Sequence, residues 1–102
     1  MFARVTRVDV RPERLHEGNL EIEEHVYPAL RMQVGYSGGL LLANPERGKM
    51  LAITLWEKEQ DMQATDEASH WFRVFSAEAV EGTITDVERY EVYQARLTHP
   101  ES

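Results

Sequence analysis

At 102 residues the chain is long enough for one domain and too short for two. Its hydrophobic content of 42% is too high for a disordered protein, and no apolar run approaches the roughly 20 residues that a membrane-spanning helix requires. A formal net charge of −7, with the basic residues scattered singly, argues against nucleic acids and membranes as partners. The absence of cysteine excludes a disulfide framework and a thiolate zinc site, which fits a cytoplasmic protein.

The first third of the chain predicts a strand followed by an interrupted helix. Residues 2–10 alternate between apolar and polar side chains, as in a half-buried strand, and Pro12 suits the first turn of a helix. Apolar residues recur at helical spacing over residues 15–30. Gly18 weakens the first half of this helix, and Pro28 should kink or interrupt it because proline lacks a backbone donor.

The rest of the chain predicts a hairpin, a second helix and a last strand. Residues 36–43 and 49–56 read as the two strands of a hairpin, with a bulge or close backbone approach at Gly38-Gly39. Residues 59–82 have helical periodicity, and residues 83–93 are rich in β-branched and aromatic side chains. The face of the second helix expected to pack on the sheet consists of Ala68, Phe72, Phe75 and Ala79.

The resulting order, β-α-β-β-α-β, is typical of ferredoxin-like α+β folds. Right-handed crossovers place both helices on one face of a four-stranded antiparallel sheet. We therefore expect one domain over residues 1–96 and a flexible C-terminal tail over residues 97–102.

The third predicted strand is apolar on both faces. Alternation directs one set of side chains to each face: Leu51, Ile53 and Leu55 on one, and Met50, Ala52 and Trp56 on the other. Two helices can cover only one face, and a domain of this size should not leave the other exposed to water. The sequence therefore predicts a homodimer that forms through the open face of the sheet.

Three segments of the chain carry a resemblance to a known family. They are Pro28-Ala29-Leu30-Arg31 through Gly35-Tyr36-Ser37-Gly38-Gly39, Leu40 to Asn44 with its turn to Gly48, and Ile53-Thr54-Leu55-Trp56-Glu57 with the helix that follows. Over about residues 2–94 the chain resembles the antibiotic biosynthesis monooxygenase (ABM) domains of the dimeric α/β-barrel superfamily. This resemblance implies two sheets packed face to face, and a pocket between each sheet and its helices.

The resemblance also implies a range of activities. It implies cofactor-independent oxygenation of a small aromatic molecule, with no cofactor and no metal. The haem-degrading branch uses an Asn on the first strand and a Trp on the second helix, where this chain has Thr6 and Thr65, which argues against haem degradation. The alternative is a binding or accessory domain without catalysis, which the absence of a strong catalytic constellation favours.

Candidate site residues follow from chemistry and from the implied pocket. His25 and His70 are the candidate catalytic residues, because imidazole titrates near neutral pH; an exposed position is the alternative for both. The candidate substrate-pocket residues are Trp71, Tyr36, Trp56 and Thr6. The alternative role for both tryptophans is packing in the core, and the alternative for Tyr36 is a loop or packing role.

Arginines on the first predicted strand need partners. Arg4 and Arg7 lie on opposite faces of that strand, and an arginine that faces inward usually requires a carboxylate. The neighbouring last strand carries Glu88 and Glu91, so the sequence predicts a cross-strand ion pair.

Overall fold

A computed structural model describes residues 1–96, with the backbone alone for residues 67–69. The tail predicted over residues 97–102 lies outside this range. All six predicted elements are present, although each helix is divided into two. In chain order the elements are β1 (Phe2–Asp9), a 3-10 turn (Pro12–Arg14), α1 (Leu15–His25), α2 (Tyr27–Leu30), β2 (Tyr36–Asn44), β3 (Lys49–Trp56), α3 (Glu59–Ala64), α4 (Asp66–Ala79) and β4 (Thr83–Glu91).

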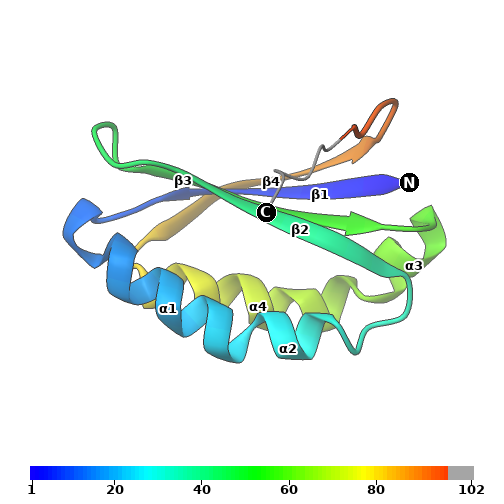
Figure 1. The fold of residues 1–102 in the computed structure, drawn as a ribbon, viewed down its shortest axis with the longest axis horizontal. Helices are drawn as coiled ribbons and strands as arrows, with labels where there is room; N and C mark the ends of the chain where they lie inside the picture. The colour runs from blue at the N-terminus through cyan, green and yellow to red at the C-terminus, as the bar shows by residue number, and fades with distance from the viewer. Residues whose placement is uncertain (97–102) are drawn as a thin grey trace, which may run out of the picture.

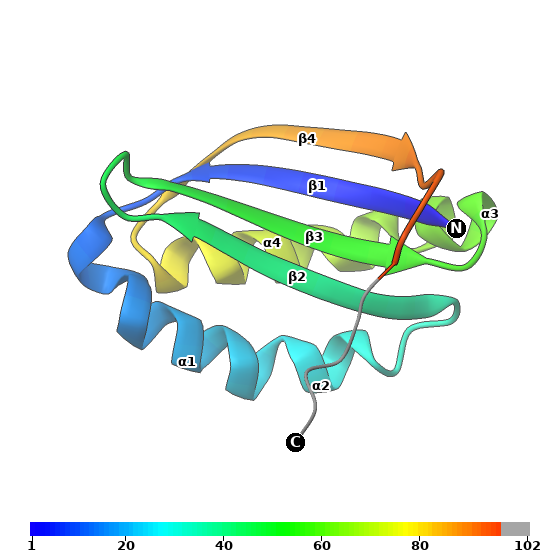
Figure 2. The ribbon, with the colours of Figure 1, turned by 45° about the horizontal axis from the view of Figure 1, so that its top comes forward.

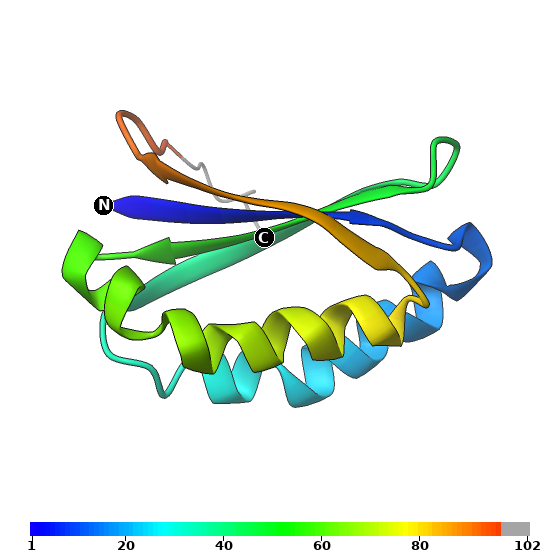
Figure 3. The same cartoon turned by 180° about the vertical axis from the view of Figure 1, so that it is seen from behind.

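The four strands form one antiparallel sheet in the order β2-β3-β1-β4 (Figure 2). β1 pairs with β3 on one side and with β4 on the other, so the two terminal strands of the chain lie side by side. The described helices all lie on one face of the sheet, and none of them covers the opposite face (Figures 1 and 3). This arrangement confirms the predicted ferredoxin-like α+β fold.

The first helix breaks at Val26, as the position of Pro28 predicts. Pro28 lies in the first turn of α2 and has no N–H to donate to the carbonyl of Glu24, so regular hydrogen bonding stops there. The hydrogen bonds from Val26 N to Ile22 O and from Leu30 N to Val26 O keep the two segments nearly continuous. The break therefore redirects α2 without separating it from α1.

The second helix breaks at Thr65, which the periodicity did not predict. The Thr65 hydroxyl donates to the carbonyls of Asp61 and Met62, at 2.9 and 3.1 Å. A hydroxyl that bonds back to the preceding turn competes with backbone hydrogen bonding and bends helices. The result is a short α3 at one end of the sheet, next to β1 and β3, and a long α4 beneath the sheet.

Gly18, whose low helix propensity the sequence analysis noted, has a packing role within α1. It is buried where α1 crosses the end of α4, and a Cβ at this position would lie 2.6 Å from the Ala79 carbonyl oxygen. The lost helix propensity of glycine is offset by this close helix–helix contact. None of the described helices is long and apolar enough to cross a membrane.

The core lies between the helices and the sheet. Phe72 and Ala79 are buried there and Phe75 is half-buried, as predicted, whereas the side chain of Ala68 lies outside the described set. Trp71 does not join the core: it is 53% exposed and stacks on Phe75, with ring centroids 5.4 Å apart. Trp71 lies outside the buried face of α4 because it is next to Phe72 in the sequence, and neighbouring helical residues point about 100° apart.

The open face of the sheet is apolar at its β2–β3 side. Met50 and Trp56 of β3 are buried under the helices, so the alternate residues of the strand face away from them. Paired residues of antiparallel strands share a face, which adds side chains of β2 to this surface. We define the open-face patch as Leu40, Leu42, Leu51, Ile53 and Leu55.

A polar cross-strand network borders this patch. Arg7 Nε donates to one carboxylate oxygen of Glu88, and the Tyr90 hydroxyl donates to the other. This is the ion pair between the first and last strands that the sequence predicts. The arginine of this ion pair is Arg7. The buried Arg4, on the other face of β1, has a partner on α4 instead.

Candidate functional site

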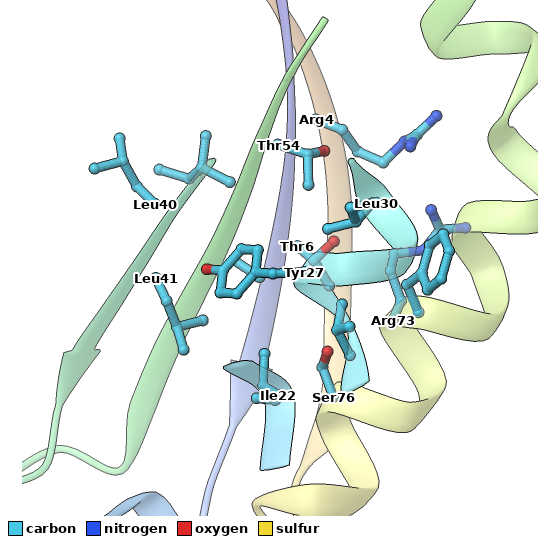
Figure 4. A pocket seen from close by; sticks show the side chains of 14 residues that line it. Arg4, Thr6, Ile22, Tyr27, Leu30, Leu40, Leu41, Thr54, Arg73 and Ser76 are labelled. Atoms are coloured by element: carbon cyan, nitrogen blue, oxygen red, sulfur yellow. The ribbon is translucent and has the colours of Figure 1, made fainter. Parts of the chain in front are cut away.

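A small cavity lies between the sheet and the helices, and it is the candidate site. It has a volume of about 50 Å³ and is partly open to the surface. Its walls are mainly apolar and come from β1, β2, β3, α1, α2 and α4 (Figure 4). The side chains that give it an apolar wall include Ile22, Val26, Leu30, Leu41 and Phe72.

Polar groups gather on the side of the cavity next to α4. The labelled side chains of Arg4 and Arg73 lie on this side, across the cavity from Leu41 (Figure 4). The hydroxyl residues Thr6, Thr54 and Ser76 complete the polar lining. The cavity therefore has an apolar side and a cationic side.

Arg4 is the most deeply buried charged group in the described part of the chain, at 2% exposure. Its Nη2 donates to the carbonyl oxygen of Met62 and lies 2.9 Å from Asp66 Oδ1. The sequence-based expectation of Glu88 or Glu91 as the partner of an inward-facing strand arginine is therefore wrong for Arg4. Those carboxylates lie on β4, whereas Arg4 extends toward α4. Asp66 is the first residue of α4.

Asp66 is shared between two arginines. Arg89 Nη2 donates to both of its carboxylate oxygens, at 2.7 and 2.9 Å. The hydrogen bond from Arg89 holds the pKa of Asp66 below its usual range, and the charge of Arg4 adds to this effect. Burial lowers the pKa of Arg4 to about 10, with Arg73 and Arg89 contributing by repulsion against the opposing effect of Asp66. Arg4 therefore stays charged at neutral pH.

Two tyrosines lie at the other end of the cavity. Tyr27 of α2 lines it, and its ring lies next to the backbone at Gly39. A Cβ at Gly39 would lie 2.9 Å from the Tyr36 hydroxyl, so the glycine makes room for that group. The bulge predicted in β2 lies between Tyr36 and Gly38, and Gly38 has a φ of +147°. Burial raises the pKa of both Tyr27 and Tyr36, so both are neutral donors at pH 7.

The structure separates the residues that the sequence proposed as a site. Thr6 lines the cavity. Trp56 is fully buried behind Arg4, and Tyr36 packs edge-on against it, with ring centroids 5.7 Å apart, so neither lines the cavity directly.

The candidate catalytic histidines lie outside this cavity. His25 and His70 are exposed and are not among the lining residues. His25 packs edge-on against Phe75 on the outer side of the helices, at a centroid distance of 5.7 Å, and the exposed Trp71 stacks on the same ring. The catalytic role of either imidazole stays a prediction.

Sequence reasoning missed Arg73 and Ser76. They are three residues apart on α4 and therefore share a helix face, beside the buried Phe72. A polar pair at this spacing next to an apolar stripe was the available signal. The deep burial of Arg4 had no local signal, because it depends on a partner from α4.

Comparison with known proteins gives distant relatives. No family model matches the chain. Two uncharacterized proteins of Mycobacterium tuberculosis are each 29% identical over 99 residues, a match that covers 97% of this chain and 44% of each relative. The chain thus spans less than half the length of the curated relatives it matches.

Solved structures share the fold over nearly the whole chain. The monooxygenase ActVA-Orf6 of Streptomyces coelicolor, in complex with nanaomycin D, has a TM-score of 0.71 at 18% identity, covering 96% of this chain and 92% of its own. The heme-degrader MhuD of M. tuberculosis has a TM-score of 0.72 at 18% identity, covering 94% and 99%. The cofactor-independent oxygenase SnoaB of Streptomyces nogalater has a TM-score of 0.59 at 19% identity, covering 98% and 97%. The chain shares its fold with these proteins, which agrees with the ferredoxin-like fold that its sequence predicts.

Proposed function

We propose that this ABM-like domain binds a small, largely apolar molecule in the cavity between its helices and its sheet. The observation that carries the proposal is the composition of the cavity, which has apolar walls and one buried cluster of polar groups. Ligand sites in proteins typically combine apolar lining with a few convergent polar groups that fix orientation. Arg4, Arg73 and the hydroxyls of Thr6 and Ser76 supply such groups here.

The size of the cavity limits how a ligand would enter. Its volume of about 50 Å³ is well below the roughly 150 Å³ of a cavity that accommodates benzene. An aromatic ring therefore requires a side chain or helix to move. Tyr27 is suited to this, because it lies on the short α2, just after the break at Val26, and its half-buried ring forms part of the wall.

Titration with 1-naphthol, followed by backbone amide NMR, tests the binding proposal. We expect the largest shifts at residues that line the cavity. Ala52→Val narrows the cavity from the centre of β3 and should weaken binding, whereas Ala43→Val, at an exposed position on β2, should leave it unchanged. Shifts confined to the open-face patch, or equal weakening by both variants, would contradict the proposal.

A second function, cofactor-independent oxygenation of a bound phenol, is favoured by the buried arginines. The fold neighbour SnoaB is described as a cofactor-independent oxygenase. Such chemistry needs a phenolate, which gives up electrons more readily than a phenol. A buried cationic cluster stabilises a phenolate and so lowers the pKa of the bound phenol. Arg4 and Arg73 are placed to provide this stabilisation.

The reaction would consume dioxygen and release water. The phenolate carbon opposite the oxygen attacks O2, one oxygen atom stays as the new carbonyl, and the O–O bond breaks as the other leaves with two hydrogens as water. For 1-naphthol the balance is one phenol and one O2 to one 1,4-naphthoquinone and one water. Oxygen uptake above the rate of autoxidation would support this function, and binding without uptake would leave a non-catalytic binding domain. Loss of uptake in His25→Ala or His70→Ala would assign proton removal to that side chain.

We also propose that the chain forms a homodimer by packing two open-face patches together. Leu40 and Leu42 are exposed, and the patch continues across β3. A stable interface buries about 800 Å² per partner, and if half of this is apolar it contributes about 10 kcal/mol per subunit before the costs of association. The curated relatives have more than half of their length outside the match, which is room for a second domain of this size in one chain.

A further inference from the structure

The arginines beside the cavity outnumber the carboxylate that they share. Arg4 and Arg89 both contact Asp66. The charge of a third arginine, Arg73, also acts on this aspartate. Among the residues whose side chains the structure describes, Asp66 is the only carboxylate in contact with Arg4. The cluster therefore carries excess positive charge beside a cavity with apolar walls.

Several N–H groups of this cluster are buried without a partner. Among the described side chains, Arg4 Nε, Arg4 Nη1 and Arg73 Nη1 are inaccessible to solvent and make no hydrogen bond. Trp56 does not replace these bonds, because its ring lies against the Arg4 guanidinium, with Cζ 5.6 Å from the ring centroid, and cation–π attraction does not occupy a donor. Leaving such donors unpaired is unfavourable, and more so on charged groups. Both arginines line the cavity, so an acceptor bound there would satisfy them.

We propose that the ligand of this cavity carries a carboxylate, which is held by Arg4 and Arg73 while its apolar body extends toward Tyr27, Leu30 and Leu41. The inference rests on the proposed binding function and specifies the class of ligand. A carboxylate has two oxygens that can accept the free donors of two guanidinium groups. A cavity of about 50 Å³ has room for a group of this size, whereas the ring would occupy the side that Tyr27 bounds.

A matched pair of ligands tests this assignment: 1-naphthoate and its neutral counterpart 1-naphthamide. We expect naphthoate to bind about 10- to 100-fold more tightly by calorimetry, the range expected for hydrogen bonds to a charged group. Arg73→Met should abolish most of this preference, and Arg73→Lys should retain part of it. Arg89→Met is the matched control, because Arg89 contacts the same Asp66 and is not among the residues that line the cavity.

Each outcome separates this inference from the proposed function. Equal affinity for the two ligands, with NMR shifts at the cavity, would overturn the carboxylate assignment and leave the binding function intact. A preference lost equally in Arg73→Met and Arg89→Met would also overturn the assignment, since general attraction to positive charge would explain it. Failure of both ligands and of 1-naphthol to bind would overturn the binding function and the assignment together.

Discussion

The guanidinium of Arg4 lies over the indole of Trp56, with 5.6 Å between Arg4 Cζ and the ring centroid. Trp56 is itself fixed, because it is fully buried and its Nε1 donates to Thr54 Oγ1 at 3.0 Å. The two side chains come from the paired strands β1 and β3. The indole thus supports the charged wall of the cavity from behind, which is the packing role that the sequence analysis offered for Trp56 beside pocket lining.

Trp56→Leu should lower the free energy of unfolding by about 3 kcal/mol, because it removes a fully buried ring and the cation–π contact. Urea denaturation provides the measurement. Trp71→Leu is the control, since Trp71 is half-exposed, and it should cost less than about 1 kcal/mol. Similar losses for the two variants would contradict the different burial of the two tryptophans.

Phe72→Ala should cost about 3–5 kcal/mol, the range for truncation of a buried phenylalanine. Phe72 belongs to the buried cluster between α4 and the sheet and also lines the cavity. Leu20→Ala, at an exposed position on α1, should stay within about 0.5 kcal/mol of the unmodified chain. A loss below about 1 kcal/mol for Phe72→Ala, measured by the same denaturation, would show that the buried face of α4 is misplaced.

Asp66→Asn should reduce stability at neutral pH and change its dependence on acid. The folded-state pKa of Asp66 is lowered, so its contribution is fully present above the ordinary aspartate pKa and is lost as the pH falls through the lowered value. Removing one partner of a buried pair is costly, but the Asp66 side chain is 42% exposed and screened by solvent, so we expect a loss of about 1–2 kcal/mol.

Urea denaturation at a series of pH values checks this expectation. The difference between the unmodified chain and Asp66→Asn should shrink toward zero as the pH falls below the ordinary aspartate range. Glu46→Gln, an exposed carboxylate in the β2–β3 turn, serves as the control. A difference that persists unchanged in acid would mean that the carboxylate charge is not what stabilises Arg4.

Leu42→Glu should convert the proposed homodimer into a monomer, because it places two charges in the centre of a symmetric apolar interface. Leu42 is 47% exposed in the single chain, and Leu20, on the helix side, is 51% exposed, so Leu20→Glu is a control of equal chemistry. Sedimentation equilibrium at micromolar concentration should give twice the 11.8 kDa chain mass for the unmodified chain and for Leu20→Glu. A folded, monomeric unmodified chain would exclude the interface.

Local sequence determined the elements of this protein and their order. Period-two alternation predicted β1, and the glycines and turn residues predicted the hairpin. Pro28 predicted the break in the first helix. Each of these signals acts within a few residues of the chain. The apolar character of both faces of β3 was also readable, since alternation alone assigns side chains to faces. From these, the fold followed by the rules of strand connection.

Only the tertiary structure decided where the charges and the cavity lie. Arg4 pairs with Asp66 because α4 packs on the face of the sheet to which Arg4 points, and nothing near either residue in the sequence encodes that contact. The same placement brings Arg73 and Ser76 into the cavity and leaves His25 and His70 outside it. Which side chains meet between a helix and a sheet depends on the rotation of the helix about its axis, and this rotation is set by the packing of the whole core rather than by periodicity.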